Sequence, residues 1–305
     1  MIPDQVLPFV CLPHFQRFES CLSSSSLFSV DDQIRQIFPL PSNKMPSGVA
    51  QRPLAVAQAP LPDVLVGNHH TKSSALHNIH FVGTISPWTN FENDVHSFCA
   101  GINWAQYTHV LTYKGKTSKP WNLDQDQTDT GDEAALQGKF RAHLGEPVTA
   151  ICTVTGRHAQ VTDFRATDVV PIDRSTPDLA IKVGDTLAGV GKAKVFWVRD
   201  HHLGHASGKI LHLRHVLGQI ALYMKIYKVK CGFHTTYKET IFLKQERTSS
   251  GWVLYYSDPI QHDAIGDRSN GTVSLRECFL YLVDEAIKSP VADNNELQWV
   301  SPDRH

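Results

Sequence analysis

The chain has 305 residues, and its 29 basic and 30 acidic side chains give a formal net charge of -1 at pH 7. This balance excludes a global attraction to nucleic acid or anionic lipid, so any such affinity has to come from local segregation of charge. The hydrophobic content of 41% suffices for a core. No apolar run of about 18 residues is present, so we expect no membrane span and no membrane partner.

Cysteine usage and the N-terminal segment predict the compartment. The six cysteines are scattered without a C-x-x-C pair, which argues against a zinc ribbon, a thioredoxin-type motif and a disulfide framework. The first residues contain no basic stretch followed by an apolar one, so no secretory signal is predicted. We therefore expect an intracellular, reducing setting, in the cytoplasm or the nucleus.

Composition divides the chain into three regions. Residues 1–87 are rich in proline and serine and show no sustained periodicity, which predicts a mostly disordered N-terminal arm. Residues 88–290 carry the periodic patterns of one folded domain. Residues 291–305 are expected to form a flexible tail.

Hydrophobic periodicity predicts both helices and strands in the central region. The expected elements are helices over residues 91–104, 132–144, 213–227 and 274–289, and strands over residues 148–154, 169–172, 177–183, 186–198, 232–245 and 251–257. Polar residues 113–131 are expected to form an exposed loop, and Gly184-Asp185 a hairpin turn. Asp132 and Glu133 suit the positive end of the second helix, and Ser274 is a candidate cap of the last one. This order is typical of a mixed-sheet α/β domain.

The most informative motif is Thr176-Pro177-Asp178-Leu179-Ala180-Ile181, followed fourteen residues after Asp178 by Lys192-Ala193-Lys194 on the strand expected to pair with it. Together with the blocks over residues 190–197, 216–224 and 232–243, this motif resembles the PD-(D/E)XK nuclease superfamily, in a lineage found in fungal proteins. The resemblance covers roughly residues 130–288. It implies a restriction-endonuclease-like αβββαβ core, with a mixed central sheet flanked by helices.

The resemblance also implies a metal site. In such domains an Asp and a Glu on neighbouring strands bind divalent cations, usually Mg²⁺, and a Lys two residues after the Glu orients the nucleophile or stabilises the transition state. Asp178 matches the motif's Asp and Lys194 its Lys. Glu133 is the first candidate for a further helix Glu and metal ligand, and Glu92 is the second. Gln219 stands where related domains often place a polar helix residue facing the site.

The sequence departs from this pattern at the carboxylate position, which is occupied by Lys192. Neither residues 186–198 nor residues 201–238 contain an Asp or a Glu, so neither the strand nor the following helix can supply the missing ligand. A Lys within about 4 Å of a dication is repelled by several kcal/mol. We therefore expect Lys192 to pair with Asp178, and catalysis to be lost or strongly weakened.

Three functions remain open at this point. The interpretation that we favour is a degenerate, weak or inactive nuclease-like protein that binds DNA or RNA, because residues 201–238 hold six Lys or Arg, six His and no acid. The candidate nucleic-acid contacts are Lys209, Arg214, Lys225 and Lys228. The alternatives are an active nuclease that hydrolyses phosphodiester bonds with Mg²⁺ as its cofactor, and a protein-interaction module.

Each candidate residue also has a plainer interpretation. Asp178 could mark only the start of a strand, and Glu133 only the start of a helix. Gln219 and Tyr223 could form a pair on a helix surface, and Lys192 and Lys194 could lie on a solvent-facing strand. The basic segment could be a solvated helix face. The histidine-rich residues 200–205 match no zinc pattern and are expected to form a loop between a strand and a helix.

Overall fold

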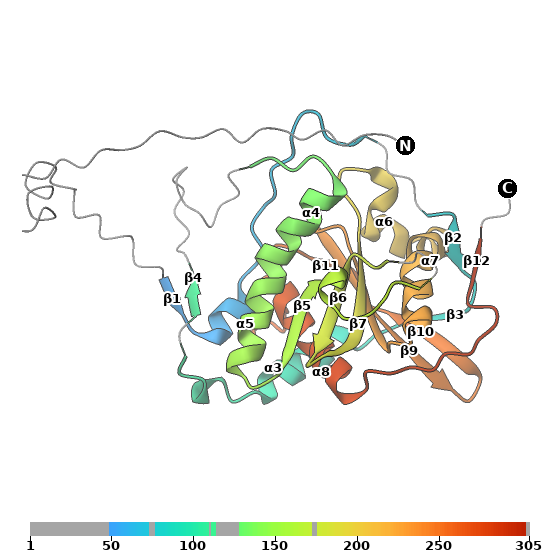
Figure 1. The fold of residues 1–305 in the computed structure, drawn as a ribbon. Coiled ribbons are helices and arrows are strands. Elements are labelled where there is room, and N and C mark those ends of the chain that lie inside the picture. Colours follow the sequence, from blue (N-terminus) through green and yellow to red (C-terminus); the bar gives the residue numbers. More distant parts are fainter. Residues whose placement is uncertain (1–48, 73–76, 110, 114–127, 173–175, 303–305) are drawn as a thin grey trace, which may run out of the picture. The chain divides into compact units, whose positions relative to one another are not determined.

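The computed structural model describes residues 49–72, 77–109, 111–113, 128–172 and 176–302. Its main feature is a mixed eight-stranded sheet. All these residues belong to the unit Ser47–His305. Helices cover both faces of the sheet (Figure 1). The mixed α/β class expected from the sequence is therefore confirmed.

Seven of the strands follow one another across the sheet in the order β3-β10-β9-β8-β7-β6-β5, and β11 pairs with β9. The strands are β3 (Thr84–Pro87), β5 (Ala159–Asp163), β6 (Leu179–Val183), β7 (Thr186–Ala193), β8 (Cys231–Thr235), β9 (Glu239–Thr248), β10 (Gly251–Tyr256) and β11 (Ile260–Gln261). The pairs β7–β8 and β3–β10 are parallel, and the other pairs are antiparallel. Two small sheets pair β1 (Val49–Gln51) with β4 (Leu111–Tyr113) and β2 (Ile79–Phe81) with β12 (Val300–Pro302).

The helices divide between the two faces of the large sheet. The α-helices are α2 (Pro53–Gln58), α3 (Phe91–Gly101), α4 (Glu133–Phe140), α5 (Glu146–Val154), α6 (Leu203–Ser207), α7 (Ile210–Ile226) and α8 (Leu275–Lys288). Shorter helical segments are η1 (Trp104–Gln106), η2 (Arg141–Gly145), η3 (Phe164–Ala166) and η4 (Arg199–His201), of which η2 is a π-helical turn that joins α4 to α5. Buried residues of α2–α5 and α8 form one hydrophobic cluster, and those of α6 and α7 form the other. None of the described helices combines the length and apolar character needed to cross a bilayer.

Several predicted elements are confirmed together with the local signals that predicted them. The Asp132 carboxylate caps α4 by accepting a hydrogen bond from the Ala135 N–H at 2.8 Å. Ser274 and Glu277 form a capping box at the start of α8, which satisfies two N–H groups of the first turn. The hairpin of β6 and β7 turns at Gly184, whose φ of 56° lies in the left-handed region that glycine tolerates.

Four strand predictions are wrong in detail. The strand expected over residues 186–198 is shorter, because β7 ends at Ala193. Residues 148–154 form helix α5, because Leu144, Val148 and Ile151 are buried at helical spacing. The strand before β6 is β5 rather than residues 169–172, which are mainly loop with one bridge position. The segment 232–245 is divided between β8 and β9 by a turn in which Tyr237 has a φ of 73°.

The predicted domain boundaries near residues 88 and 290 are also wrong. Residues 1–48 lie outside the described residues, but residues 49–72 and 77–87 contribute α2 and an edge strand of the main sheet, and Ala57 and Phe81 are fully buried. At the other end, Trp299 is fully buried and its indole N–H donates to the Ala221 carbonyl at 3.0 Å. Sequence patterns missed both segments because they pack as short pieces against distant parts of the chain.

Candidate functional site

Four charged residues singled out in the sequence meet at the end of the β6–β7 hairpin. The Lys192 Nζ lies 2.7 Å from the Asp178 Oδ2 and 2.9 Å from the Glu133 Oε1, and the Lys194 Nζ lies 3.0 Å from the Glu133 Oε2. We call these four residues the ion cluster. Two carboxylates and two ammonium groups give it no net charge.

Local structure explains why these residues converge. Asp178 stands immediately before β6, and its N–H donates to the Gly191 carbonyl on β7 at 3.1 Å. Lys192 lies near the end of β7, and the Ala193 N–H donates to the Asp178 Oδ2 at 2.8 Å. Glu133 is the first residue of α4, which places its carboxylate over the hairpin. The cluster therefore joins one helix to two strands.

Burial decides how these charges behave. The exposed fractions of the side chains are 8% for Lys192, 12% for Lys194, 13% for Asp178 and 27% for Glu133. The interpretation of the two lysines as a solvent-facing strand is therefore wrong. The cluster meets solvent mainly at Glu133, so an approaching anion would encounter a carboxylate first.

The pKa directions in the cluster follow from burial and ion pairing. Burial raises the pKa of Asp178, although Lys192 and the Ala193 N–H favour its charged form. Burial also acts to raise the pKa of Glu133, but Lys192 and Lys194 outweigh it and the pKa is lowered. Burial opposes the charge of Lys192, yet Asp178 and Glu133 raise its pKa above the ordinary 10.5, so its ammonium persists at neutral pH.

Helix α7 carries Gln219, the polar residue that the sequence placed near the site. Its Gln219 Nε2 donates to the Tyr223 hydroxyl at 2.7 Å, and Tyr223 is only 5% exposed, so this pair is not the surface pair that the sequence allowed. Burial raises the pKa of Tyr223, and the charges of Lys192 and Asp178 also act on it. Gln219 is thus bonded to a tyrosine on which the charges of the ion cluster act, and no hydrogen bond among the described residues joins Gln219 to the cluster itself.

The sequence analysis missed His234, which lies beside Lys192 in the parallel pair of β7 and β8. Its ring is buried, and neither ring nitrogen has a hydrogen-bond partner among the described residues. Burial, with Lys192 and Lys194 nearby, lowers its pKa to about 3, so the ring is neutral at pH 7. The signal in the sequence was a histidine within a strand whose other residues are apolar or small.

Two sequence-based alternatives do not join the site. Glu92 lies exposed on α3 and makes no contact with Asp178 or the two lysines in the described structure. The histidine-rich residues 200–205 fold into η4 and α6, where His202 donates its Nε2–H to the Phe196 carbonyl at 2.8 Å. Within the residues that the structure describes, no group of three His, Cys, Asp or Glu is arranged to hold a metal ion.

The predicted nucleic-acid contacts are largely engaged by other parts of the chain. The Arg214 Nη1 donates to the Gly83 carbonyl at 2.8 Å and to the Phe81 carbonyl at 3.2 Å. Lys225 donates to the carbonyl of Glu296, and Lys228 forms an ion pair with Asp293 at 3.0 Å. Lys209 is exposed at the start of α7. The basic side chains of residues 201–238 are thus partly bound by carbonyl and carboxylate groups from other parts of the chain.

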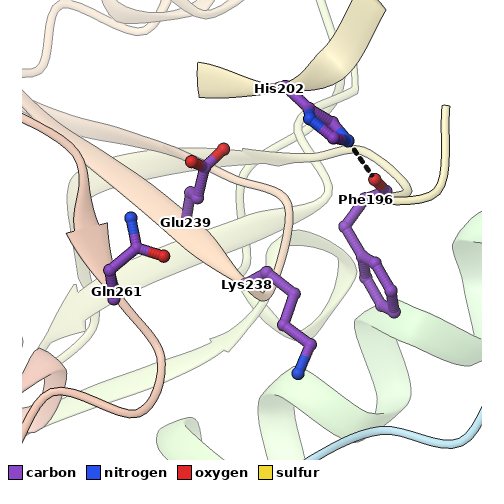
Figure 2. Close-up of a pocket in the computed structure, with 5 residues that line it drawn as sticks. All are labelled: Phe196, His202, Lys238, Glu239 and Gln261. Atoms are coloured by element: carbon purple, nitrogen blue, oxygen red, sulfur yellow. Dashed lines mark hydrogen bonds between the residues drawn. The ribbon is translucent and has the colours of Figure 1, made fainter. Parts of the chain in front are cut away.

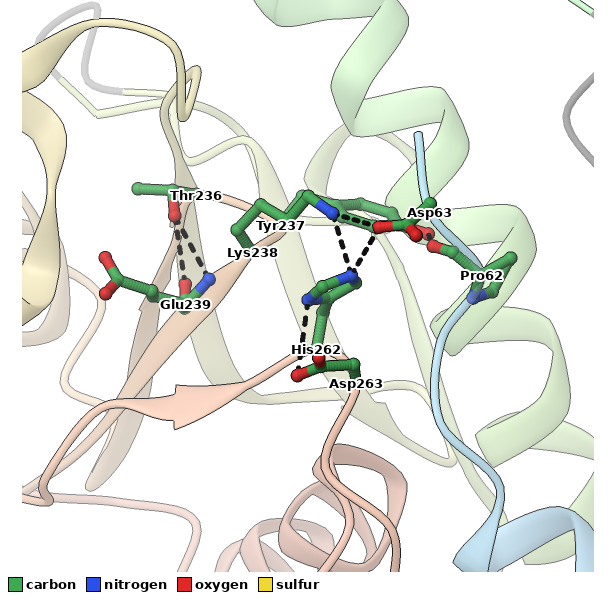
Figure 3. A network of polar contacts seen from close by, with 8 residues as sticks. All are labelled: Pro62, Asp63, Thr236, Tyr237, Lys238, Glu239, His262 and Asp263. Atoms are coloured by element: carbon green, nitrogen blue, oxygen red, sulfur yellow. Dashed lines mark hydrogen bonds and ion pairs between the residues drawn. The ribbon is translucent and has the colours of Figure 1, made fainter. Parts of the chain in front are cut away.

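A second polar cluster lies at the turn between β8 and β9. The Asp63 carboxylate contacts the Lys238 ammonium and lies 3.0 Å from the His262 Nε2 (Figure 3). The Tyr237 hydroxyl donates to the Pro62 carbonyl at 2.7 Å. These contacts hold the segment after α2 against the sheet, so we assign them a structural role.

A small pocket opens beside this turn. It is lined by Phe196, His202, Lys238, Glu239 and Gln261 (Figure 2). The Glu239 carboxylate accepts hydrogen bonds from the N–H groups of Leu203 and Gly204, at 2.7 and 3.3 Å. Glu239 therefore caps α6 and is not free to receive a ligand.

Comparison of the chain with models of protein families, with curated proteins and with solved structures finds no match. The geometry of the ion cluster is therefore the basis for a functional proposal.

Proposed function

We propose that the chain is a catalytically inactive protein of the PD-(D/E)XK nuclease type, in which an internal ion cluster takes the place of the divalent cation. The observation that carries the proposal is the Lys192 ammonium, which lies within 2.9 Å of both the Glu133 and the Asp178 carboxylates. These carboxylates are the oxygen ligands that the resemblance assigns to Mg²⁺.

The order of elements supports the fold part of the proposal. Helix α5 is followed by β5, β6 and β7, then by α7 and β8, which gives the αβββαβ order. Asp178 precedes the second of these strands, and Lys192 and Lys194 lie at the end of the third and just beyond it. This is the arrangement that the resemblance implies for the Asp and the Lys of the motif.

The residues present do not fit a Mg²⁺ ion. Both carboxylates already have an ammonium partner, and a cation placed between them would meet the charge of Lys192 at close range. Such a contact is repulsive by several kcal/mol at about 4 Å, even at an effective dielectric constant near 20. Metal-dependent phosphodiester hydrolysis is therefore not expected at this site.

The experiment compares the wild type with Lys192→Glu in a calorimetric titration with Mn²⁺ and in a nuclease assay with Mg²⁺. The wild type is expected to show neither binding nor cleavage. Lys192→Glu should gain Mn²⁺ affinity, because it removes one ammonium and leaves three carboxylates around the site. Lys72→Glu makes the same charge change at an exposed position that is neither in the ion cluster nor a candidate nucleic-acid contact, and it serves as the control. Tight metal binding by the wild type, or cleavage that depends on Asp178, would show that the proposal is wrong.

Nucleic-acid binding without cleavage is a second candidate. It rests on the exposed Lys209 and on Lys228, whose side chain is 66% exposed despite its ion pair. Binding should weaken as salt is raised, because it would depend on phosphate contacts. A double variant with Glu at both positions should bind DNA and RNA less tightly than the wild type. No binding by the wild type at low salt removes this candidate.

The proposal includes an intracellular setting, in the cytoplasm or the nucleus. Cys99, Cys152, Cys231 and Cys278 are buried free thiols, which is compatible with a reducing compartment.

A further inference from the structure

Strand β3 forms one edge of the large sheet. Its inner side pairs in parallel with β10, with Thr84 opposite Val253 and Pro87 opposite Tyr256. No described strand pairs with its outer side, and Thr84 and Pro87 are exposed (Figure 1). An unpaired edge presents backbone N–H and C=O groups that a strand from another chain can bind.

A groove of about 430 Å³ lies along this edge. It is lined by Val82 before β3, by Thr84 on β3, by Trp252 on β10, by Arg214 on α7 and by Glu296 before β12. Four segments of the chain therefore meet at this groove, which lies over the beginning of β3 and of β10.

Exposed apolar side chains come from the same segments. The exposed fractions are 40% for Val82, 49% for Ile210, 81% for Leu211 and 92% for Leu297. Ile210 lies one helical turn before Arg214, and Leu297 lies between two residues that line the groove. Val82 lines the groove itself, and the other three are close in sequence to residues that line it. Single exposed apolar residues are ordinary, but several on neighbouring segments favour an interaction surface.

The charges of the groove indicate the occupant. Arg214 donates hydrogen bonds through its Nη1 alone in the described structure, so the rest of its guanidinium remains available. The backbone of Glu296 is engaged by Asn294 and Lys225, but its carboxylate forms no ion pair with any described residue. A surface that carries one cation and one anion can be complementary to itself when two copies face each other across a two-fold axis.

We propose that this surface binds a second copy of the chain. In the dimer, β3 of one copy pairs antiparallel with β3 of the other, which joins the two sheets. Leu211 and Leu297 become buried, and the Glu296 carboxylate of each copy faces Arg214 of the other. The inference goes beyond the proposed function and does not depend on the ion cluster.

Sedimentation equilibrium of the full chain over a range of concentrations tests the proposal. The wild type should show a monomer–dimer equilibrium. Leu211→Asp and Leu297→Asp should each raise the dissociation constant at least about tenfold, because a charge would be buried in the interface. Glu296→Lys should also weaken the dimer, since it places like charges opposite each other.

Val170→Asp is the matched control, because Val170 is 78% exposed on the loop before β6 and lies outside the groove. It should leave the dissociation constant unchanged. All four positions are at least partly exposed, so circular dichroism should show the native fold in every variant. A wild type that stays monomeric at every concentration overturns the proposal, and so does a dimer that tolerates both Leu→Asp substitutions.

Discussion

The substitution Lys192→Met tests the energetic role of the ion cluster most directly. It keeps the length of the side chain and removes the ammonium that contacts Asp178 and Glu133. Asp178 is then left as a carboxylate with only 13% of its side chain exposed. The expected result is a marked loss of stability, because the remaining carboxylates have lost their shared partner.

The magnitude follows from burial and from the contacts that survive. Removing one member of a buried ion pair costs about 3–5 kcal/mol. Here the Ala193 N–H still binds Asp178 at 2.8 Å, and Lys194 still binds the partly exposed Glu133 at 3.0 Å. These contacts reduce the expected loss in the free energy of unfolding to about 2–4 kcal/mol.

The measurement is urea unfolding of the wild type, Lys192→Met and the double variant Lys192→Met/Asp178→Asn, all at pH 7. The double variant removes both charges of the closest pair and should therefore be more stable than the single variant. A loss below about 1 kcal/mol in the single variant would refute the reasoning, since the ion cluster would then contribute little to the fold. A double variant less stable than the single one would show that the unpaired carboxylate is not the cause.

Three further outcomes are expected. Ile181→Ala should lower the free energy of unfolding by about 2–5 kcal/mol in urea titrations, because the Ile181 side chain is fully buried on β6. Glu133→Gln should cost about 1–2 kcal/mol at pH 7 through its two charged hydrogen bonds. Because the folded-state pKa of Glu133 is lowered, its charge stabilises the protein above pH 4.5. The difference in the free energy of unfolding between Glu133→Gln and the wild type, measured across pH, should therefore shrink as the pH falls below that value. Deletion of residues 1–87 should abolish cooperative thermal unfolding, since it removes β3 and buried Phe81, whereas deletion of residues 1–46 should preserve it.

Local signals in the sequence were sufficient for elements whose stability depends on their own pattern. The apolar periodicity of α7 and the Ser274 cap of α8 predicted both helices, because each signal lies within a few residues of the backbone that it shapes. The turn at Gly184 likewise identified the hairpin of β6 and β7. Once this hairpin was placed, period-two alternation put Lys192 and Lys194 on one side of the strand, next to Asp178.

The tertiary structure decided what depends on distant contacts. Only packing distinguished Glu133 from Glu92 as the partner of the two lysines, since both acids stand at the start of a helix. Composition favoured a strand where α5 forms, because β-branched residues suit both a strand and a buried helix face. The count of charges over residues 201–238 could not show that Lys228 pairs with Asp293, because Asp293 lies outside that segment. The sequence by itself thus determined the charges of the candidate site and the β6–β7 hairpin around which they gather. The fold determined which partner neutralises each charge, because the energy of an ion pair depends on distance and burial rather than on separation along the chain.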